Sequence, residues 1–266
     1  MGLAIALVVT AITVISVGIF WSHHWWFPVD ISTHGMAIDH QFVITFILTG
    51  IIFVLAQVAL GYLVWRHRDR GDGRRATFSH GNNTFEALWT IATAIMFIGL
   101  NLMGYRIWAG IQFTGAEPGA MQIEVWGQQF QWYFHYPGLD GQFGKYNVEK
   151  VNDAGGNFLG LDRDHDQAAQ DDIVTATLAI PANRPVQLIL RSKDVTHSFF
   201  VRELRAKQDL VPGLEIPIHF TATQTGRYEI ACAELCGLGH YKMRAFFEVK
   251  SEEDFQKWLA TMAAQQ

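Results

Sequence analysis

The sequence predicts a membrane-anchored α+β protein, in which three transmembrane helices precede an all-β domain. Half of the 266 residues are apolar, and three long uncharged apolar runs lie before residue 110. After Met121 the chain changes to short stretches rich in aromatic and β-branched residues, which are typical of strands. The net charge of −5 excludes a generally basic nucleic-acid-binding protein, so we expect no nucleic-acid partner.

The apolar runs cover residues 3–21, 42–65 and 87–105. A helix needs about 20 apolar residues to cross a bilayer, so each run is long enough to span one. A buried core helix is the alternative, but the second run has 24 uncharged residues, more than a soluble core normally uses. The first run lacks the basic start and the small-residue cleavage site of a secretory signal. We therefore expect a retained helix that leads into an aromatic interface segment, WSHHWWFP at 21–28.

The loops predict the orientation in the membrane. Residues 66–85 hold five arginines, whereas residues 22–41 hold neither lysine nor arginine. Because positive loops stay in the cytoplasm, the chain after about residue 109 is expected outside. This predicts a multi-pass protein of the bacterial inner membrane with a periplasmic C-terminal domain. The expected parts are an extra helix and outer loop at 1–41, a helical hairpin at 42–109, and an outer domain with a C-terminal helix at 110–266.

The outer domain is expected to be a sandwich or barrel with Greek-key connections, because turn residues separate its short strands. The expected strands lie at 121–136, 173–180, 185–192, 196–201, 215–222, 227–233 and 244–249. Ser251 and Asp254 have the spacing of a capping box before a final amphipathic helix.

The longest irregular segment, residues 137–172, is interpreted as a solvated acidic loop. Its sequence DRDHD at 162–166 begins like a calcium loop. The match fails because Gln167 and Ile173 replace the required glycine and glutamate.

The only two cysteines, Cys232 and Cys236, lie in CAELCGLGHYKM with His240 and Met243. A disulfide is the simplest interpretation of two thiols in an oxidising periplasm. Thiolate, imidazole and thioether together form a soft ligand set, however, and such sets select copper. Zinc rarely uses a thioether. His197, at the start of an expected strand, is the candidate second histidine.

Two cysteines permit two copper ions bridged by both sulfurs, with one histidine on each ion. Met243 and a backbone carbonyl of the loop, that of Glu234, would then take the weak positions. Such a shell leaves no open position for a substrate, so the centre is expected to relay single electrons.

CAELCGLGHYKM, together with DVTHSFF at 194–200, resembles the binuclear copper (CuA) signature of subunit II of cytochrome c oxidase. NTFEALWT at 83–90, GQQFQWYFHYPG at 127–138 and KQDLVPG at 207–213 are similar to further segments of that family. The resemblance covers nearly the whole chain and implies a cupredoxin domain at 121–250. The first helix is extra relative to the family's usual hairpin.

The resemblance also implies roles for single residues. Cys232 and Cys236 would bridge the two copper ions. His197 and Met243 would complete one ion, and His240 with the Glu234 carbonyl the other. The Glu234 carboxylate would help to bind magnesium at the interface with subunit I.

Three further features take their roles from the family. Glu86 matches a glutamate near the entrance of a proton path, and it also fits a helix N3 glutamate capped by Asn83. Phe130 stands where the family has its electron-accepting aromatic residue, usually tryptophan, and Trp132 is a nearby candidate. Five aspartates could steer a basic cytochrome c: Asp162, Asp164, Asp166, Asp171 and Asp172.

The implied function is that of the electron-accepting subunit of cytochrome c oxidase. Electrons from cytochrome c, or from a membrane-bound c-type cytochrome, would pass through CuA to haem in subunit I. There O2 is reduced to water and protons are pumped. The expected partners are subunit I, the other oxidase subunits and the lipid bilayer, with haem only in the partner subunit. Alternatives are the CuA subunit of a nitric oxide reductase and a membrane-tethered copper chaperone, while the outer subunit of a quinol oxidase would lack the copper ligands.

Overall fold

The computed structural model describes residues 2–23, 27–75, 77–78 and 80–265, which form two compact units. The helical unit holds residues 1–28 and 37–110, and the β unit holds residues 29–36 and 111–266. Three residues of the expected aromatic interface segment, His24, Trp25 and Trp26, lie outside the described residues.

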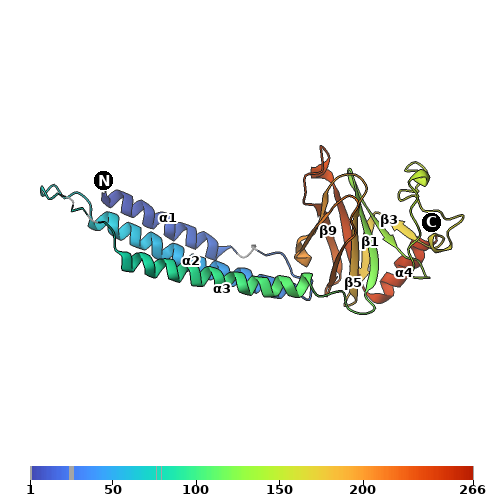
Figure 1. The fold of residues 1–266 in the computed structure, drawn as a ribbon, viewed down its shortest axis with the longest axis horizontal. Helices are drawn as coiled ribbons and strands as arrows, with labels where there is room; N and C mark the ends of the chain where they lie inside the picture. Colours follow the sequence, from blue (N-terminus) through green and yellow to red (C-terminus); the bar gives the residue numbers. More distant parts are fainter. Residues whose placement is uncertain (1, 24–26, 76, 79, 266) are drawn as a thin grey trace. The chain divides into compact units, whose positions relative to one another are not determined.

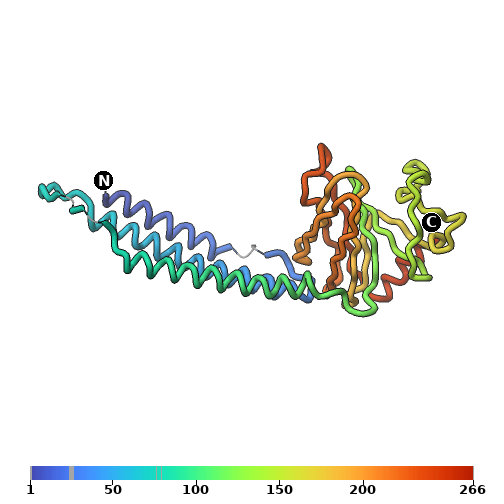
Figure 2. The backbone as a smooth tube through the Cα atoms, viewed as in Figure 1, coloured from blue at the N-terminus to red at the C-terminus, as the bar shows by residue number. Residues whose placement is uncertain are grey.

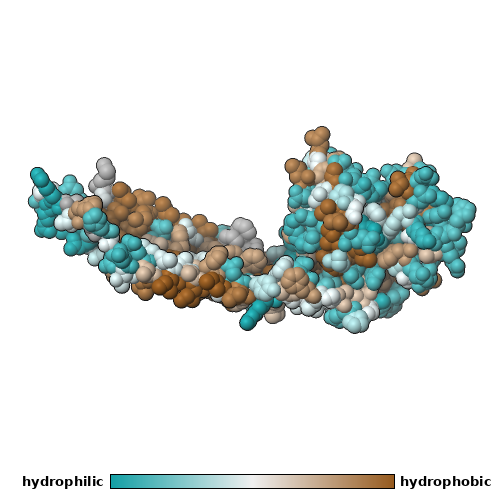
Figure 3. Space-filling model, in the orientation of Figure 1, coloured by the Kyte–Doolittle hydropathy of each residue, from teal (hydrophilic) through white to brown (hydrophobic). Residues whose placement is uncertain are grey.

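The helical unit contains α1 (Gly2–Ser22), α2 (Gly35–Arg66) and α3 (Asn83–Gln112). All three are long and apolar enough to cross a membrane, as predicted. α2 and α3 extend beyond their apolar runs at both ends. Figure 3 shows apolar residues gathered over the helices, and side chains such as Leu55 and Ile95 are largely exposed. A surface of this kind requires lipid or other apolar partners.

Small residues bring α1 against α2. A Cβ added at Gly61 would lie 3.7 Å from Thr10 Oγ1 and 3.8 Å from the Ala6 carbonyl. Ala6 and Thr13 are correspondingly buried. Close approach over small residues is how transmembrane helices pack without a hydrophobic driving force between them. α1 is therefore an integral part of the helical unit.

The first turn of α3 corrects one prediction. The Asn82 side chain accepts hydrogen bonds from Thr84 N at 3.0 Å and Phe85 N at 3.2 Å. An N-cap side chain binds the amides two and three residues ahead, so Asn82 is the cap and Asn83 is already helical. The prediction that Asn83 caps the helix is wrong by one residue. Glu86 remains in the first turn, and its backbone N–H donates to the Asn82 carbonyl at 3.0 Å.

The β unit consists of two five-stranded sheets (Figure 1). The first has the order β3-β2-β1-β5-β8 and the second has the order β4-β10-β9-β6-β7. β1 pairs with β5 and β4 pairs with β10 in parallel, while the other pairs are antiparallel. Since neither parallel pair is consecutive in the chain, the connections must cross over. The strands are β1 (Met121–Gln128), β2 (Gln131–Tyr136), β3 (Ile173–Thr175), β4 (Thr177–Pro181), β5 (Pro185–Ser192), β6 (His197–Val201), β7 (Ala206–Leu210), β8 (Ile216–Thr221), β9 (Gly226–Cys232) and β10 (Arg244–Lys250).

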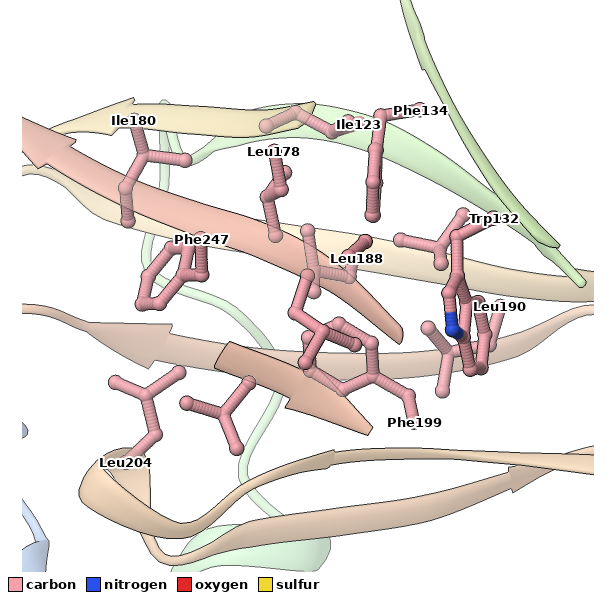
Figure 4. Close-up of a cluster of buried hydrophobic side chains, with 14 of the residues drawn as sticks. Ile123, Trp132, Phe134, Leu178, Ile180, Leu188, Leu190, Phe199, Leu204 and Phe247 are labelled. Atoms are coloured by element: carbon pink, nitrogen blue, oxygen red, sulfur yellow. The ribbon is translucent and has the colours of Figure 1, made fainter. Parts of the chain in front are cut away.

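Side chains from both sheets fill one core. Alternate residues of β5 are buried, as expected for a strand with one face inward. Figure 4 shows Ile123 and Leu188 of the first sheet beside Leu178 and Phe247 of the second, and all four are fully buried. The all-β prediction for the outer domain is confirmed.

Two segments outside the sheets complete this core. Ile31 is fully buried, its N–H donates to the Glu203 carbonyl at 3.1 Å, and its carbonyl accepts from Thr223 N at 2.7 Å. α4 (Glu252–Ala263) packs against β3, β4 and β10 and buries Phe255. Ser251 Oγ accepts from Asp254 N at 3.1 Å, so the predicted helix cap is confirmed.

Several expected strand boundaries were wrong. The stretch 121–136 is the β1–β2 hairpin, which turns at Gln129–Phe130 without a glycine or proline signal. The stretch 173–180 is divided at Ala176, where the chain passes from one sheet to the other. β7 was not predicted, because its sequence AKQDL is mostly polar.

The segment 137–172, here called the cover, is not a solvated loop. Figure 2 traces it as irregular backbone, but it packs on the first sheet. Tyr133 of β2 stacks on Phe158 with ring centroids 4.7 Å apart, and Leu159, Leu161 and Ala169 are buried with it. The cover thus has a small core of its own.

A buried ion cluster holds the cover to the sheet. His135 Nδ1 lies 2.8 Å from Glu124 Oε2, and its Nε2 lies 2.8 Å from Asp172 Oδ2. None of these side chains is more than 2% exposed. Asp172 also accepts from Gly144 N at 2.8 Å, and Arg191 Nε lies 3.0 Å from Glu124 Oε1. The prediction that Asp172 is an exposed charge that steers a cytochrome c is therefore wrong, because its carboxylate is buried against His135.

This cluster makes the stability of the β unit dependent on pH. Burial alone would lower the pKa of His135, but Asp172 and Glu124 outweigh it and raise that pKa. A raised folded-state pKa means that the stabilisation is fully present below about pH 6.5 and is lost as the pH rises through the folded-state value. We expect His135→Gln to destabilise the β unit by roughly 3–5 kcal/mol and to remove this pH dependence.

Denaturant unfolding of the full chain in detergent, followed by tryptophan fluorescence across this pH range, measures both effects. The matched control is His165→Gln, since His165 is exposed and lies on the same cover. An identical pH profile for His135→Gln and the unmodified chain would contradict the assignment.

Candidate metal centre

Strand pairing closes the loop that carries four of the five predicted ligand side chains and the Glu234 carbonyl. Cys232 is the last residue of β9, and Met243 directly precedes β10. These strands pair antiparallel, and Cys232 N donates to the Met243 carbonyl at 3.0 Å. The two ends of the loop are therefore adjacent, and Cys236 and His240 must lie between them.

The fifth predicted side chain comes from a neighbouring strand. β6 pairs with β9 so that Phe199 is opposite Cys232. His197 lies two residues before Phe199, on the same face of β6, because side chains alternate along a strand. His197 Nδ1 is 3.9 Å from Cys232 Sγ.

The donor atoms form one cluster, in which His197, both cysteines and Met243 are buried and His240 is half-buried. The two sulfurs are 3.9 Å apart, and both cysteines are free. Cys236 Sγ lies 3.7 Å from His240 Nδ1 and 3.7 Å from Met243 Sδ. Cys232 Sγ lies 3.2 Å from the Glu234 carbonyl oxygen. All of the predicted donors are thus brought together.

The cluster fits a thiolate-bridged metal pair. A disulfide needs about 2.05 Å between its sulfurs, so these thiols are not bonded to each other. Two sulfurs that each lie about 2.3 Å from one metal can be at most about 4.6 Å apart, and 3.9 Å satisfies this limit. Each sulfur also has one imidazole nitrogen and one further donor beside it. Thiolates, imidazoles and a thioether are the donors that copper prefers.

Asp194 orients the His197 ring. Its Oδ1 lies 2.8 Å from His197 Nε2, and its Oδ2 accepts from Gln129 N at 2.8 Å. With Nε2 held by the carboxylate, Nδ1 faces the thiols as a metal ligand would. Burial lowers the pKa of His197, but Cys232 and Asp194 outweigh it and raise that pKa.

The two thiols differ in acidity. Burial opposes ionisation of Cys232, yet His197 and backbone groups at Glu234 and Ser198 bring the pKa of this thiol to about 6. Burial and the neighbouring Cys232 raise the pKa of Cys236 to about 11. The metal-free pair therefore holds one proton near neutral pH, and bridging by both thiolates must release it.

Two functional residues escaped the sequence interpretation. Gly127 lies against His197, where an added Cβ would be 2.8 Å from His197 Cδ2. Gln129 Nε2 donates to the Cys236 carbonyl at 2.6 Å and so ties the β1–β2 turn to the ligand loop. A glycine inside a strand signals close approach, but the sequence does not show what approaches it.

The two candidates for electron acceptance occupy different environments. Phe130 is 37% exposed, and its ring packs on the ligand loop at Gly239, where an added Cβ would lie 2.4 Å from Phe130 Cγ. Trp132 is 2% exposed, with its ring centroid 6.2 Å from that of His197. Only Phe130 can touch a docked protein.

The remaining predicted residues lie outside the cluster. The Glu234 side chain is exposed, although its carbonyl faces Cys232. Glu86 belongs to the helical unit. Among the described residues, His197, Cys232 and Cys236 form the only group of three histidine, cysteine or acidic ligands with metal-like spacing.

These features define a membrane-anchored protein with a cupredoxin-like domain that carries a cluster of soft donor side chains. Residues 121–249 match the family described as cytochrome c oxidase subunit II, periplasmic domain, and residues 23–107 match its transmembrane domain. The chain therefore belongs to the cytochrome c oxidase subunit II family, whose members are subunits of an oxidoreductase complex. α1 precedes the matched transmembrane segment.

Known proteins agree over most of the chain. The alternative cytochrome c oxidase subunit 2 of Bradyrhizobium diazoefficiens is 36% identical over 97% of this chain and 91% of its own length. Cytochrome c oxidase subunit 2 of Thermostichus vulcanus is 28% identical over 94% and 83%, respectively. The crystal structure of the periplasmic domain of subunit II of cytochrome oxidase from Bradyrhizobium japonicum was also matched. The match covers 57% of this chain and 97% of the crystallised chain, at 24% identity and a TM-score of 0.41.

The contact between Gly127 and His197 yields a prediction. We expect Gly127→Ala to displace the imidazole and to destabilise the β unit by about 1–3 kcal/mol, because an extra methyl group must enter a packed site. Denaturant unfolding of the full chain measures the loss. Gly115→Ala is the control, since no atom lies within 4 Å of its added Cβ. Equal stability of the two variants would contradict the packing argument.

Proposed function

We propose that this chain is the electron-accepting subunit of a cytochrome c oxidase and that its β unit holds a binuclear CuA centre. The observation that carries the proposal is the pair of free thiols 3.9 Å apart with two further donors beside each sulfur. Cys232 has His197 Nδ1 and the Glu234 carbonyl, while Cys236 has His240 Nδ1 and Met243 Sδ.

The ligands have separate roles in this proposal. Cys232 and Cys236 would bridge the two copper ions. His197 and Met243 would hold one ion, and His240 with the Glu234 carbonyl would hold the other. When bound, the copper pair supplies a one-electron relay. The chain holds the ligands in place through strand pairing and the Asp194 contact, and His197, both cysteines and Met243 are buried.

In the proposed route, a cytochrome c or a membrane-bound c-type cytochrome delivers electrons near Phe130. From the β unit the electrons would continue to haem in subunit I, where O2 would be reduced to water and protons would be pumped. Because Trp132 is buried, it could carry electrons only within the β unit. Of the four remaining steering aspartates, Asp164 is exposed. Asp162 pairs with Lys150, Asp166 accepts from Lys145 N, and Asp171 accepts from Asp140 N.

Other parts of the proposal concern the assembled oxidase. The exposed Glu234 carboxylate would bind magnesium at the subunit I interface, which manganese substitution and electron paramagnetic resonance can test. Glu86, in the first turn of α3, would stand near a proton-path entrance, which proton uptake by the E86Q oxidase can test.

The proposed topology is that of a multi-pass inner-membrane protein. An additional helix and outer loop at 1–41 and a hairpin at 42–109 would lead to a periplasmic domain at 110–266. Protease accessibility in spheroplasts tests this arrangement. Three helices able to span a membrane support it.

Metal analysis provides the decisive test of the proposed centre. The full chain, purified in detergent and loaded with copper, is expected to hold two copper ions per chain. Its electron paramagnetic resonance spectrum should show hyperfine coupling to two equivalent copper nuclei, because the bridging thiolates would spread one unpaired electron over both ions. Cys236→Ser should abolish this signal. A single-copper spectrum would favour the chaperone alternative, and a purified complex that reduces nitric oxide rather than O2 would assign the reductase alternative.

Phe130 provides a second test. We expect Phe130→Ala to slow oxidation of reduced cytochrome c by roughly tenfold, as expected when a contact worth about 1.4 kcal/mol is removed. The copper spectrum should stay unchanged, because Phe130 donates no ligand. Leu238→Ala is the control, since Leu238 is 95% exposed on the same loop. An unchanged rate in Phe130→Ala oxidase would move electron acceptance elsewhere.

A further inference from the structure

A pocket of about 510 Å³ opens beside the ligand loop and reaches three of the proposed copper ligands. Cys232, His240 and Met243 line it. Cys232 is 8% exposed and Met243 is 2% exposed, so both form its floor. The pocket therefore offers one thiol, one imidazole and one thioether to a molecule that enters from solvent.

The opposite side of the ligand cluster is closed. Cys236 does not line the pocket and is 3% exposed. Gln129 binds the Cys236 carbonyl, and the Phe130 ring packs on Gly239. A metal ion that arrives in the folded chain thus meets Cys232 before Cys236.

The rim of this pocket carries more positive than negative charge. Lys242 and Arg244 line it together with Glu229. Arg244 Nη1 is 3.6 Å from Glu229 Oε1, and both side chains are more than half exposed. Such an exposed pair binds weakly and leaves the pocket accessible. A net positive rim slows the approach of a bare cation and favours an anion.

We propose that this pocket is the entrance for copper and that copper enters as a cuprous ion held by thiolates in an anionic complex. The inference rests on the proposed copper centre. The volume of the pocket lies in the range of small-ligand pockets, about 300–1,000 Å³, so the pocket can accept a complex larger than a bare ion.

The transfer is a ligand exchange without oxidation or reduction. The Cys232 sulfur forms a bond to the cuprous ion as one carrier thiolate leaves it. Cys232 reacts as the thiolate, so the carrier thiolate leaves as an anion and no proton is transferred in this exchange. His240 and Met243, which share the pocket, can then replace the remaining carrier ligand. Copper stays cuprous throughout, and no sulfur is oxidised.

Stopped-flow copper uptake by the reduced, metal-free full chain in detergent tests the proposal, with copper–thiolate absorbance as the signal. The anionic probe is the copper(I)–glutathione complex, and the cationic probe is the copper(I)–acetonitrile complex. The test variant carries Lys242→Glu and Arg244→Glu. The matched control carries Arg227→Glu and Lys257→Glu, which change the total charge equally at exposed positions outside the pocket.

Uptake from glutathione should fall by about tenfold in the test variant at low ionic strength and recover towards the control at high salt. Uptake from acetonitrile should not fall. Ala231→Phe, which fills the pocket without altering a ligand or a charge, should slow uptake from both probes. This second variant decides the question if the charge variant does not fold.

Equal glutathione rates in the test and control variants, or a normal rate in Ala231→Phe, would overturn the pocket as the entrance. The uptake rates test the pocket, whereas the copper species formed at the end tests the proposed copper centre. If the unmodified chain binds no copper from either probe, the proposed function fails and this inference fails with it. If it forms the copper pair at rates that the pocket variants do not alter, only this inference fails.

Discussion

Closure of a twelve-residue loop by strand pairing is the constraint on which the donor cluster depends. The hydrogen bond from Cys232 N to the Met243 carbonyl fixes the two ends of the loop against each other. Soft donors spaced along the loop then have no choice but to converge. The cost of ordering them is met by the paired strands β9 and β10, which are anchored in the main core through Ile230 and Phe247. The ligand set is therefore a property of the sandwich and not of the loop alone.

A second layer of contacts connects this cluster to the rest of the β unit. Asp194 contacts both His197 and the β1–β2 turn. Gln129 of that turn in turn binds the Cys236 carbonyl. Lys193, beside Asp194, binds both Gln128 Oε1 and the Phe158 carbonyl of the cover at 2.7 Å. A continuous set of polar contacts thus leads from the buried imidazole to the cover. Partly exposed charged groups thus keep separate segments in register around the site.

Contacts within one short segment could be predicted from the sequence, whereas most contacts between segments far apart in the chain could not. The convergence of the four donor side chains of the loop was predictable because they lie within one short segment. The approach of His197 was predicted from its place at the start of a strand. The partnership of His135 with Glu124 and Asp172 was not, since it joins three segments whose order in space only the folded sheet defines. For the same reason the sequence predicted that the cover is solvated, although one of its aspartates, Asp172, is buried. The helix cap was displaced by one residue because Asn82 and Asn83 have the same side chain and only backbone geometry distinguishes them.

The position of Ile31 has a practical consequence for dissecting this protein. A water-soluble fragment that starts after the third helix would leave behind a side chain that is fully buried among both sheets. Its loss would forfeit about 1.5–3 kcal/mol of apolar burial and strip the Glu203 carbonyl of its donor. Recombinant versions of the outer domain therefore need residues 29–36 restored, either by circular permutation or as a separate peptide.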